Sequence, residues 1–242
     1  MKRAERRRLK ENEVVALLRR AAERWTSQRR RVVAGIVLAV IAAAAGGGYL
    51  SWRRNTEARA AAMLSDALAI LDAEVASRPE SAAGQPTPPQ APGTYPSERA
   101  KLEAALPRLR AVREAFPGTQ AARAATYHAA AVLAALGRHQ EAEREYQAVI
   151  DAGDPLYART ARLGLADLLS TAGQFDRAIT LYRQLVADDD SPLPADAVLA
   201  QLGRTYLRAG RREDARQTYQ RIVREFPDSP YAADARRELG RL

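Results

Sequence analysis

The spacing of apolar and polar residues divides this chain into three parts. A run without a charged side chain covers residues 32–52, VVAGIVLAVIAAAAGGGYLSW. Before it, apolar residues recur every three or four positions between Val14 and Trp25, as on one face of a helix. After it, helical spacing returns over residues 53–77 and again from residue 98 onward. The pattern therefore predicts an all-α chain in which one uncharged helix separates a basic N-terminal helix from a larger helical part.

The uncharged run is long enough to cross a bilayer. A helix of 21 residues reaches about 30 Å, the thickness of the hydrocarbon layer. Tyr49 and Trp52 lie at its end, where aromatic rings favour the headgroup level. We expect residues 32–52 to form a transmembrane helix. A cleaved signal peptide is an alternative, because small residues at 43–45 precede Gly46, and a buried core helix is another.

Charge gives this segment an orientation. The chain carries a formal net charge of +9, and residues 1–31 hold 12 Lys and Arg against 4 Glu. Positive flanks stay in the cytoplasm, so we expect a cytoplasmic tail, an inner-membrane helix and an extracytoplasmic, periplasmic C-terminal part. The tail is either a topology signal alone or an amphipathic helix that binds lipid or a cytoplasmic partner. Nucleic acid is an unlikely partner, because the membrane helix explains the arginines.

Prolines interrupt the helical pattern after residue 77. The segment 53–77 is predicted to continue the helix out of the membrane, with an apolar stripe through Met63, Leu64, Leu68, Ile70 and Leu71. Residues 78–97 contain six prolines and predict a linker or a long loop. Pro-rich chain is semi-extended, so it is expected to hold the next domain away from the bilayer. Pro107 is expected to kink or end the helix that follows.

A sequence pattern then repeats every 36 or 37 residues. In each copy a Gly is followed by Ala five positions later and by Tyr four positions after that. The three copies contain Gly137, Ala142 and Tyr146, then Gly173, Ala178 and Tyr182, then Gly210, Ala215 and Tyr219. A fixed period of this length is typical of a helical solenoid.

The repeated residues have separate structural roles in a helix pair. The Gly takes the left-handed conformation that ends the first helix, the Ala lets the second helix approach it, and the Tyr fills the groove between units. Thr119, Asp154 and Ser229 are predicted N-caps, the last two followed by Pro at the first helical position.

The third copy resembles a tetratricopeptide repeat. Its matching residues are Leu202, Gly203, Tyr206, Gly210, Ala215, Tyr219 and Pro227. The two earlier copies diverge, because they lack the Leu-Gly-Tyr of the first helix. The resemblance implies a short tetratricopeptide-like α-solenoid over 98–242. Its expected parts are a degenerate half-repeat at 98–118, repeats at about 119–154, 155–191 and 192–228, and a capping helix at 230–241.

The same resemblance implies a binding function. It places partner-groove positions on each first helix, here Tyr127, Thr160, Asp167, Arg204 and Arg208. The ending FPDSPYAADARREL resembles repeats of the Tol-Pal coordinator and of outer-membrane assembly lipoproteins, and the overall layout resembles the ancillary subunit of the SecYEG translocon. These resemblances imply a scaffold for protein partners in the cell envelope, with a translocon-associated, chaperone-like role. The alternatives are a soluble periplasmic adaptor of outer-membrane or cell-wall assembly after signal cleavage, and a recruiter acting through the basic tail.

Composition argues against an enzyme. The chain has no Cys and only 2 His, which excludes disulfides, thiolate metal sites and a cysteine nucleophile. His128 and His139 lie within the repeat pattern, and ordinary packed or exposed side chains explain them. We therefore expect no catalytic residues, no cofactor and no metal site.

Overall fold

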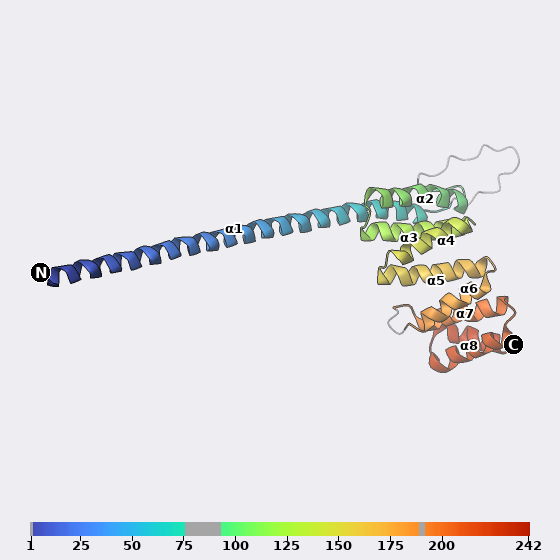
Figure 1. The fold of residues 1–242 in the computed structure, drawn as a ribbon. Coiled ribbons are helices and arrows are strands. Elements are labelled where there is room, and N and C mark those ends of the chain that lie inside the picture. Colours follow the sequence, from blue (N-terminus) through green and yellow to red (C-terminus); the bar gives the residue numbers. More distant parts are fainter. Residues whose placement is uncertain (1, 76–92, 189–191) are drawn as a thin grey trace. The chain divides into compact units, whose positions relative to one another are not determined.

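The computed structural model describes residues 2–75, 93–188 and 192–242, and it leaves out the side chains of 2–30 and 32. The described residues form helices joined by short turns (Figure 1). The helices are α1 (Lys2–Asp72), α2 (Glu98–Ala115), α3 (Gln120–Ala135), α4 (His139–Asp151), α5 (Pro155–Thr171), α6 (Phe175–Val186), α7 (Ala195–Arg208), α8 (Arg212–Glu225) and α9 (Pro230–Leu239). The chain divides into two compact units, Met1–Asn55 and Thr56–Leu242.

The first unit is the N-terminal part of α1. Apolar side chains of the uncharged run are exposed, including Leu38 at 67% and Trp52 at 63%. The segment Val33–Asp72 contains a window with mean hydropathy 2.1 and no buried residue, long and apolar enough to cross a membrane. A signal sequence meets the same criteria. The predicted apolar stripe from Val14 to Trp25 lies on helical backbone, but its side chains fall outside the described residues.

The second unit begins with the last turns of α1. Ala60 and Ala67 are fully buried there, and Met63, Leu64, Leu68 and Leu71 pack against the core cluster. The backbone N–H of Gln120, at the start of α3, donates to the Glu57 carboxylate at 3.2 Å. Residues 56–72 are thus part of the same packed unit as the repeats.

The residues on either side of the Pro-rich stretch contact each other. Val75 and Tyr95 form an isolated parallel bridge, and the N–H of Tyr95 donates to the carbonyl of Glu74 at 3.0 Å. The end of α1 and the start of α2 therefore lie close together. Residues 76–92 themselves lie outside the described part.

Helix α2 continues through Pro107, so the expectation that this residue ends the helix is wrong. Pro107 is exposed, while its neighbours Leu106 and Leu109 are buried in the core. The carbonyl that loses its helical donor belongs to exposed Glu103, where water can satisfy it. Packing of the buried side therefore holds the helix together.

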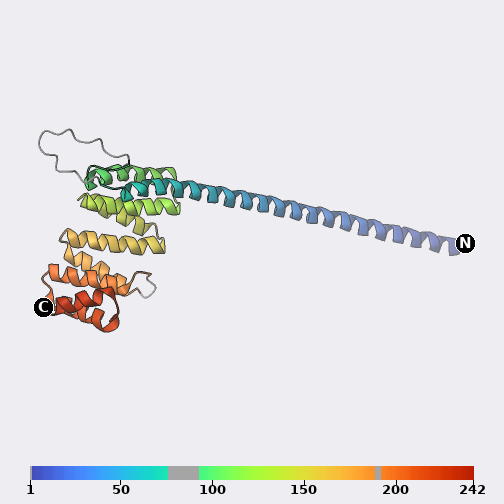
Figure 2. The same cartoon turned by 180° about the vertical axis from the view of Figure 1, so that it is seen from behind.

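The three repeats are helix pairs, α3 with α4, α5 with α6 and α7 with α8, and α9 follows them (Figures 1 and 2). The turn glycines Gly137, Gly173 and Gly210 have φ of +76°, +78° and +74°. A side chain would be strained in this left-handed conformation. The alanines five positions later, Ala142, Ala178 and Ala215, are all 0% exposed.

Side-chain caps start α3, α5 and α9 as expected. The hydroxyls of Thr119 and Ser229 accept from Ala122 and Tyr231, and the carboxylate of Asp154 accepts from Leu156 and Tyr157. Pro155 and Pro230 occupy the first turn. These caps satisfy N–H groups that have no partner within the helix.

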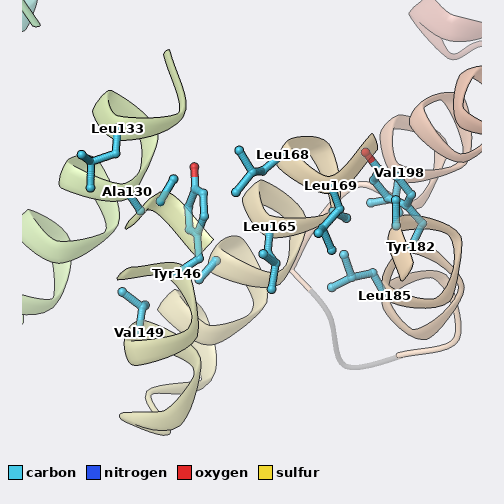
Figure 3. Packing of buried hydrophobic residues seen from close by; sticks show 14 of the residues in the cluster. Ala130, Leu133, Tyr146, Val149, Leu165, Leu168, Leu169, Tyr182, Leu185 and Val198 are labelled. Atoms are coloured by element: carbon cyan, nitrogen blue, oxygen red, sulfur yellow. The ribbon is translucent and has the colours of Figure 1, made fainter. Parts of the chain in front are cut away.

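The repeat tyrosines fill two kinds of gap. Tyr146 of α4 lies between Ala130 of α3 and Leu165 of α5 (Figure 3), next to Gly164, and so joins two units. Tyr219 instead packs against Gly203 within its own unit. A Cβ atom at Gly203 would lie 2.7 Å from the Tyr219 ring. This residue allows the close approach of α7 and α8.

We predict that Gly203→Ala lowers the free energy of unfolding by about 1 kcal/mol. Overpacking typically costs ~1–3 kcal/mol, which exceeds the gain of ~1 kcal/mol in helix propensity. Gly240→Ala is the matched control, because its Cβ would meet only ordinary contacts at 3.5 Å or more. Thermal unfolding followed by circular dichroism measures both. Equal stability of the two variants would contradict the packing role of Gly203.

Candidate protein-binding groove

The first helices of the repeats form one layer of the solenoid. Helix α3 contacts α5, α5 contacts α7 and α7 contacts α9. In the described residues, α4 makes no comparable contact with α6, nor α6 with α8. The layer of first helices is therefore the more tightly spaced one, which is the inner side of a curved solenoid. Inner faces of this kind are extended binding surfaces.

The five predicted groove residues lie on these first helices. Tyr127 is on α3, Thr160 and Asp167 are on α5, and Arg204 and Arg208 are on α7. The two arginines are exposed, and the other three side chains are partly buried. The Thr160 hydroxyl donates to the carbonyl of Leu156 at 3.0 Å, so its hydrogen is bonded within α5. Among the described residues, Thr160 forms no hydrogen bond with the other four.

Tyr127 and Asp167 belong to a cluster of tyrosines around one carboxylate. The Tyr127 ring meets the Tyr146 ring edge-on, with centroids 5.9 Å apart. The Tyr182 hydroxyl donates to Asp167 Oδ1 at 2.5 Å. Burial raises the pKa of Tyr127, and the negative charge of Asp167 adds to the shift. The structure thus brings two predicted residues, from α3 and α5, into one electrostatic cluster.

Two effects oppose each other at the Asp167 carboxyl. Burial raises its pKa, because the charged form loses water, and the hydrogen bond from Tyr182 lowers it. The net pKa is above the ordinary value. This group therefore stabilises the fold most at low pH, and its contribution declines as the pH rises through its folded-state pKa.

Buried hydroxyls link this cluster to Arg208. The Ser170 and Thr205 hydroxyls are 2.9 Å apart, and Arg208 Nη1 donates to Ser170 Oγ at 3.3 Å. The Arg208 guanidinium also lies over the Phe175 ring, 5.6 Å from its centroid. Sequence reasoning missed Ser170 and Thr205. The available signal was a small polar residue at a position that the helical pattern assigns to the core.

Arg204 and Arg208 line a pocket between α7 and α9, with a volume of about 610 Å³. Arg237 of α9 and Arg241, just after α9, also line it, and each is paired with a carboxylate one turn away, Asp234 and Glu238 respectively. No carboxylate among the described residues pairs with Arg204 or Arg208 in this way; Arg204 Nη1 contacts only the Gln201 amide oxygen, at 3.4 Å.

Tyr219 of α8 also lines this pocket. It is 3% exposed, and its hydroxyl is buried with no hydrogen-bond partner among the described residues. Burial raises the pKa of Tyr219 to about 12. The arginines give the pocket excess positive charge, which suits a carboxylate.

The contribution of α9 was not predicted, because residues 230–241 were interpreted only as a cap. The signal was present in the helical spacing of Tyr231, Asp234, Glu238 and Arg241, which places these residues on one face.

We predict that Tyr182→Phe raises the pKa of Asp167. The Tyr182 hydroxyl stabilises the charged carboxylate by donating a hydrogen bond to it, and the variant removes this bond. Tyr146→Phe is the control, because in the described structure the Asp167 carboxylate accepts from Tyr182 and not from Tyr146. Carbon-13 NMR of the Asp167 carboxyl during a pH titration gives both values. An equal shift in the two variants, or a fall in the Tyr182 variant, would contradict the assignment.

Known structures share the fold of the helix pairs. Two structures of a Podosopora anserina chain, described as a kinesin light chain with nearly identical TPR-like repeats, match with a TM-score of 0.51 and 20% identity. The matches cover 58% of this chain and 76% and 77% of those chains. A tetratricopeptide repeat protein from Parabacteroides merdae matches with a TM-score of 0.48 and 19% identity, over 59% of this chain and 54% of that one. No curated protein matches the chain.

A family model gives the assignment. The tetratricopeptide repeat model matches residues 97–157, 163–230 and 200–242, which together are more than half of the chain. Repeats of this family are generally non-catalytic scaffolds for other proteins. The signature residues, the capped helix pairs and the match together show that this chain belongs to the tetratricopeptide repeat family.

Proposed function

We propose that this protein is a membrane-anchored scaffold whose layer of first helices binds an extended segment of another protein in the cell envelope. The observation that carries the proposal is the pair Arg204 and Arg208. They lie one helical turn apart on α7, they are exposed, and they line a pocket of about 610 Å³. The segment would place an acidic residue there.

The other end of the groove favours a different side chain. The Asp167 carboxylate and the Tyr127 ring lie on α5 and α3, toward the N-terminal end of the solenoid. A basic or aromatic side chain would be attracted to them. The bound segment would thus run along the layer with opposite charges at its two ends, which gives it a direction.

The membrane anchor is supported by the uncharged run and its flanks. Residues 32–52 carry no charge, and residues 1–31 hold nearly the whole net positive charge of the chain. On this basis the tail is cytoplasmic and the repeats are extracytoplasmic, on the periplasmic side of an inner membrane. Secreted chains near the translocon are then the partner class that such a position would favour. A soluble periplasmic adaptor after cleavage before Gly46 is the alternative.

Binding can be tested by photo-crosslinking in the cells that produce the chain. We predict that a photoreactive residue at Arg204 or Asp167 forms adducts with a partner, whereas one at Arg144, on the exposed surface of α4, does not. Arg208→Glu should lower the adduct yield at position 204 about tenfold, because reversing the charge of a contacting residue costs on the order of 1.4 kcal/mol or more. Equal yields from all three sites would contradict a groove on the first helices.

The orientation can be tested with reporters fused after Leu242. We predict that a phosphatase active only outside the cytoplasm is active there, and that a reporter active only inside the cytoplasm is not. Mass spectrometry of the membrane-bound chain should find residues 1–31 still present. A soluble product beginning at Gly46 would favour the adaptor alternative and exclude the anchor.

A further inference from the structure

The second helices α2, α4, α6 and α8 form the other layer of the solenoid, and three grooves lie between successive members. The first groove, between α2 and α4, is bridged by ion pairs within the chain. Arg110 Nη2 lies 3.3 Å from Glu141 Oε2, and Arg113 Nη1 lies 2.5 Å from Glu145 Oε2. Here the chain supplies both the arginines and the carboxylates.

The second groove, between α4 and α6, is also bridged. Arg177 Nη2 lies 2.6 Å from Glu143 Oε1. Ile150 and Leu181 occupy the repeat positions of Arg113 and Glu145, and both are partly buried against the core cluster. An ion pair and apolar packing therefore close this groove.

The third groove, between α6 and α8, has one of the two matching carboxylates replaced, and a longer ion pair joins Arg211 Nη1 to Asp176 Oδ1 of α6 at 3.6 Å. The repeat register places Arg183 where the first groove has Arg110, but Thr218 stands at the position of Glu145. Asp214, at the position of Glu141, is paired with Arg211 at 2.7 Å in its own turn. No ion-pair partner of Arg183 is present in residues 93–188 or 192–242.

This groove is open. A pocket of about 590 Å³ lies between α6 and α8, and the buried residues Leu199, Leu202 and Tyr206 of α7 contribute to its wall. Three arginines line it, Arg183, Arg211 and Arg221. Arg211 is paired with Asp214 and Asp176, and Arg221 is paired with Glu225, so among the described residues Arg183 is the lining arginine without an ion pair. The apolar base and the Arg183 guanidinium are complementary to an acidic side chain next to an apolar one.

We propose that the groove between α6 and α8 is a second docking surface, which binds an acidic segment of a partner protein. A carboxylate of the partner pairs with Arg183, as Glu141 of this chain pairs with Arg110, and a neighbouring apolar side chain contacts Val186 and Tyr206. The surface lies on the layer of second helices, so it is independent of the groove proposed for the first helices. The scaffold would then hold two partners at once.

The test uses the full chain in detergent and exploits its lack of cysteine. A bimane dye is attached through Gln217→Cys, an exposed position that lines the pocket, in an Arg204→Gln, Arg208→Gln background. The probe is the acetylated peptide Trp-Leu-Glu-Ala-Leu-Glu-Ala, whose tryptophan quenches bimane on contact. We expect saturable quenching at low salt, and a Kd at least about tenfold higher after Arg183→Gln with Arg221→Gln.

Controls separate this surface from the other groove. A dye attached through Arg241→Cys, at the pocket between α7 and α9, should show no saturable quenching in the same background. The peptide with both glutamates replaced by glutamine should bind at least about tenfold more weakly. Thermal unfolding verifies that the variants are folded.

Several results would overturn the proposal. They are the absence of saturable quenching at position 217, an unchanged Kd in the Arg183 and Arg221 variant, and equal binding of the glutamine peptide. Displacement of the probe by inorganic phosphate better than by chloride at equal ionic strength would indicate a general anion site instead. None of these results bears on crosslinking from Arg204. The proposal for the groove between α6 and α8 and the proposal for the first helices are therefore tested separately.

Discussion

The solenoid depends on how closely the two helices of each unit approach. A fully buried alanine at the same position of every second helix, Ala142, Ala178 or Ala215, sets this distance. In the last unit Gly203 leaves room for the ring of Tyr219. Because each unit contacts only its neighbours, small changes in this distance accumulate along the stack and determine where pockets open between helices.

The fold could be predicted from the sequence because its signals are local. Gly137, Gly173 and Gly210 each mark a left-handed turn, and capping residues such as Asp154 mark helix starts. The role of residues 56–72 could not be predicted in this way. An apolar stripe on a helix shows that it packs, but not against what, and the bridge between Val75 and Tyr95 depends on long-range packing.

The candidate site was predictable only in part. The family resemblance placed Asp167 and Arg208 on first helices. It did not indicate that the Tyr182 hydroxyl donates a hydrogen bond to Asp167, or that Arg208 donates one to buried Ser170. These partners come from other helices, and no spacing rule connects them. Arg183 is a similar case. It has no ion-pair partner in the part of the chain that the structure describes, because Thr218 replaces a carboxylate across the groove and Asp214 pairs with Arg211.

The bridge between Val75 and Tyr95 has a consequence for how this protein can vary. It fixes the two ends of the Pro-rich segment at one place, with the last turns of α1 on one side and α2 on the other. The entropy of closing such a segment changes slowly with its length, by about 0.6 kcal/mol for each doubling. Insertions and deletions between these anchor points should therefore cost little stability, which makes this segment the natural place for the chain to gain or lose residues while the packed repeats stay intact.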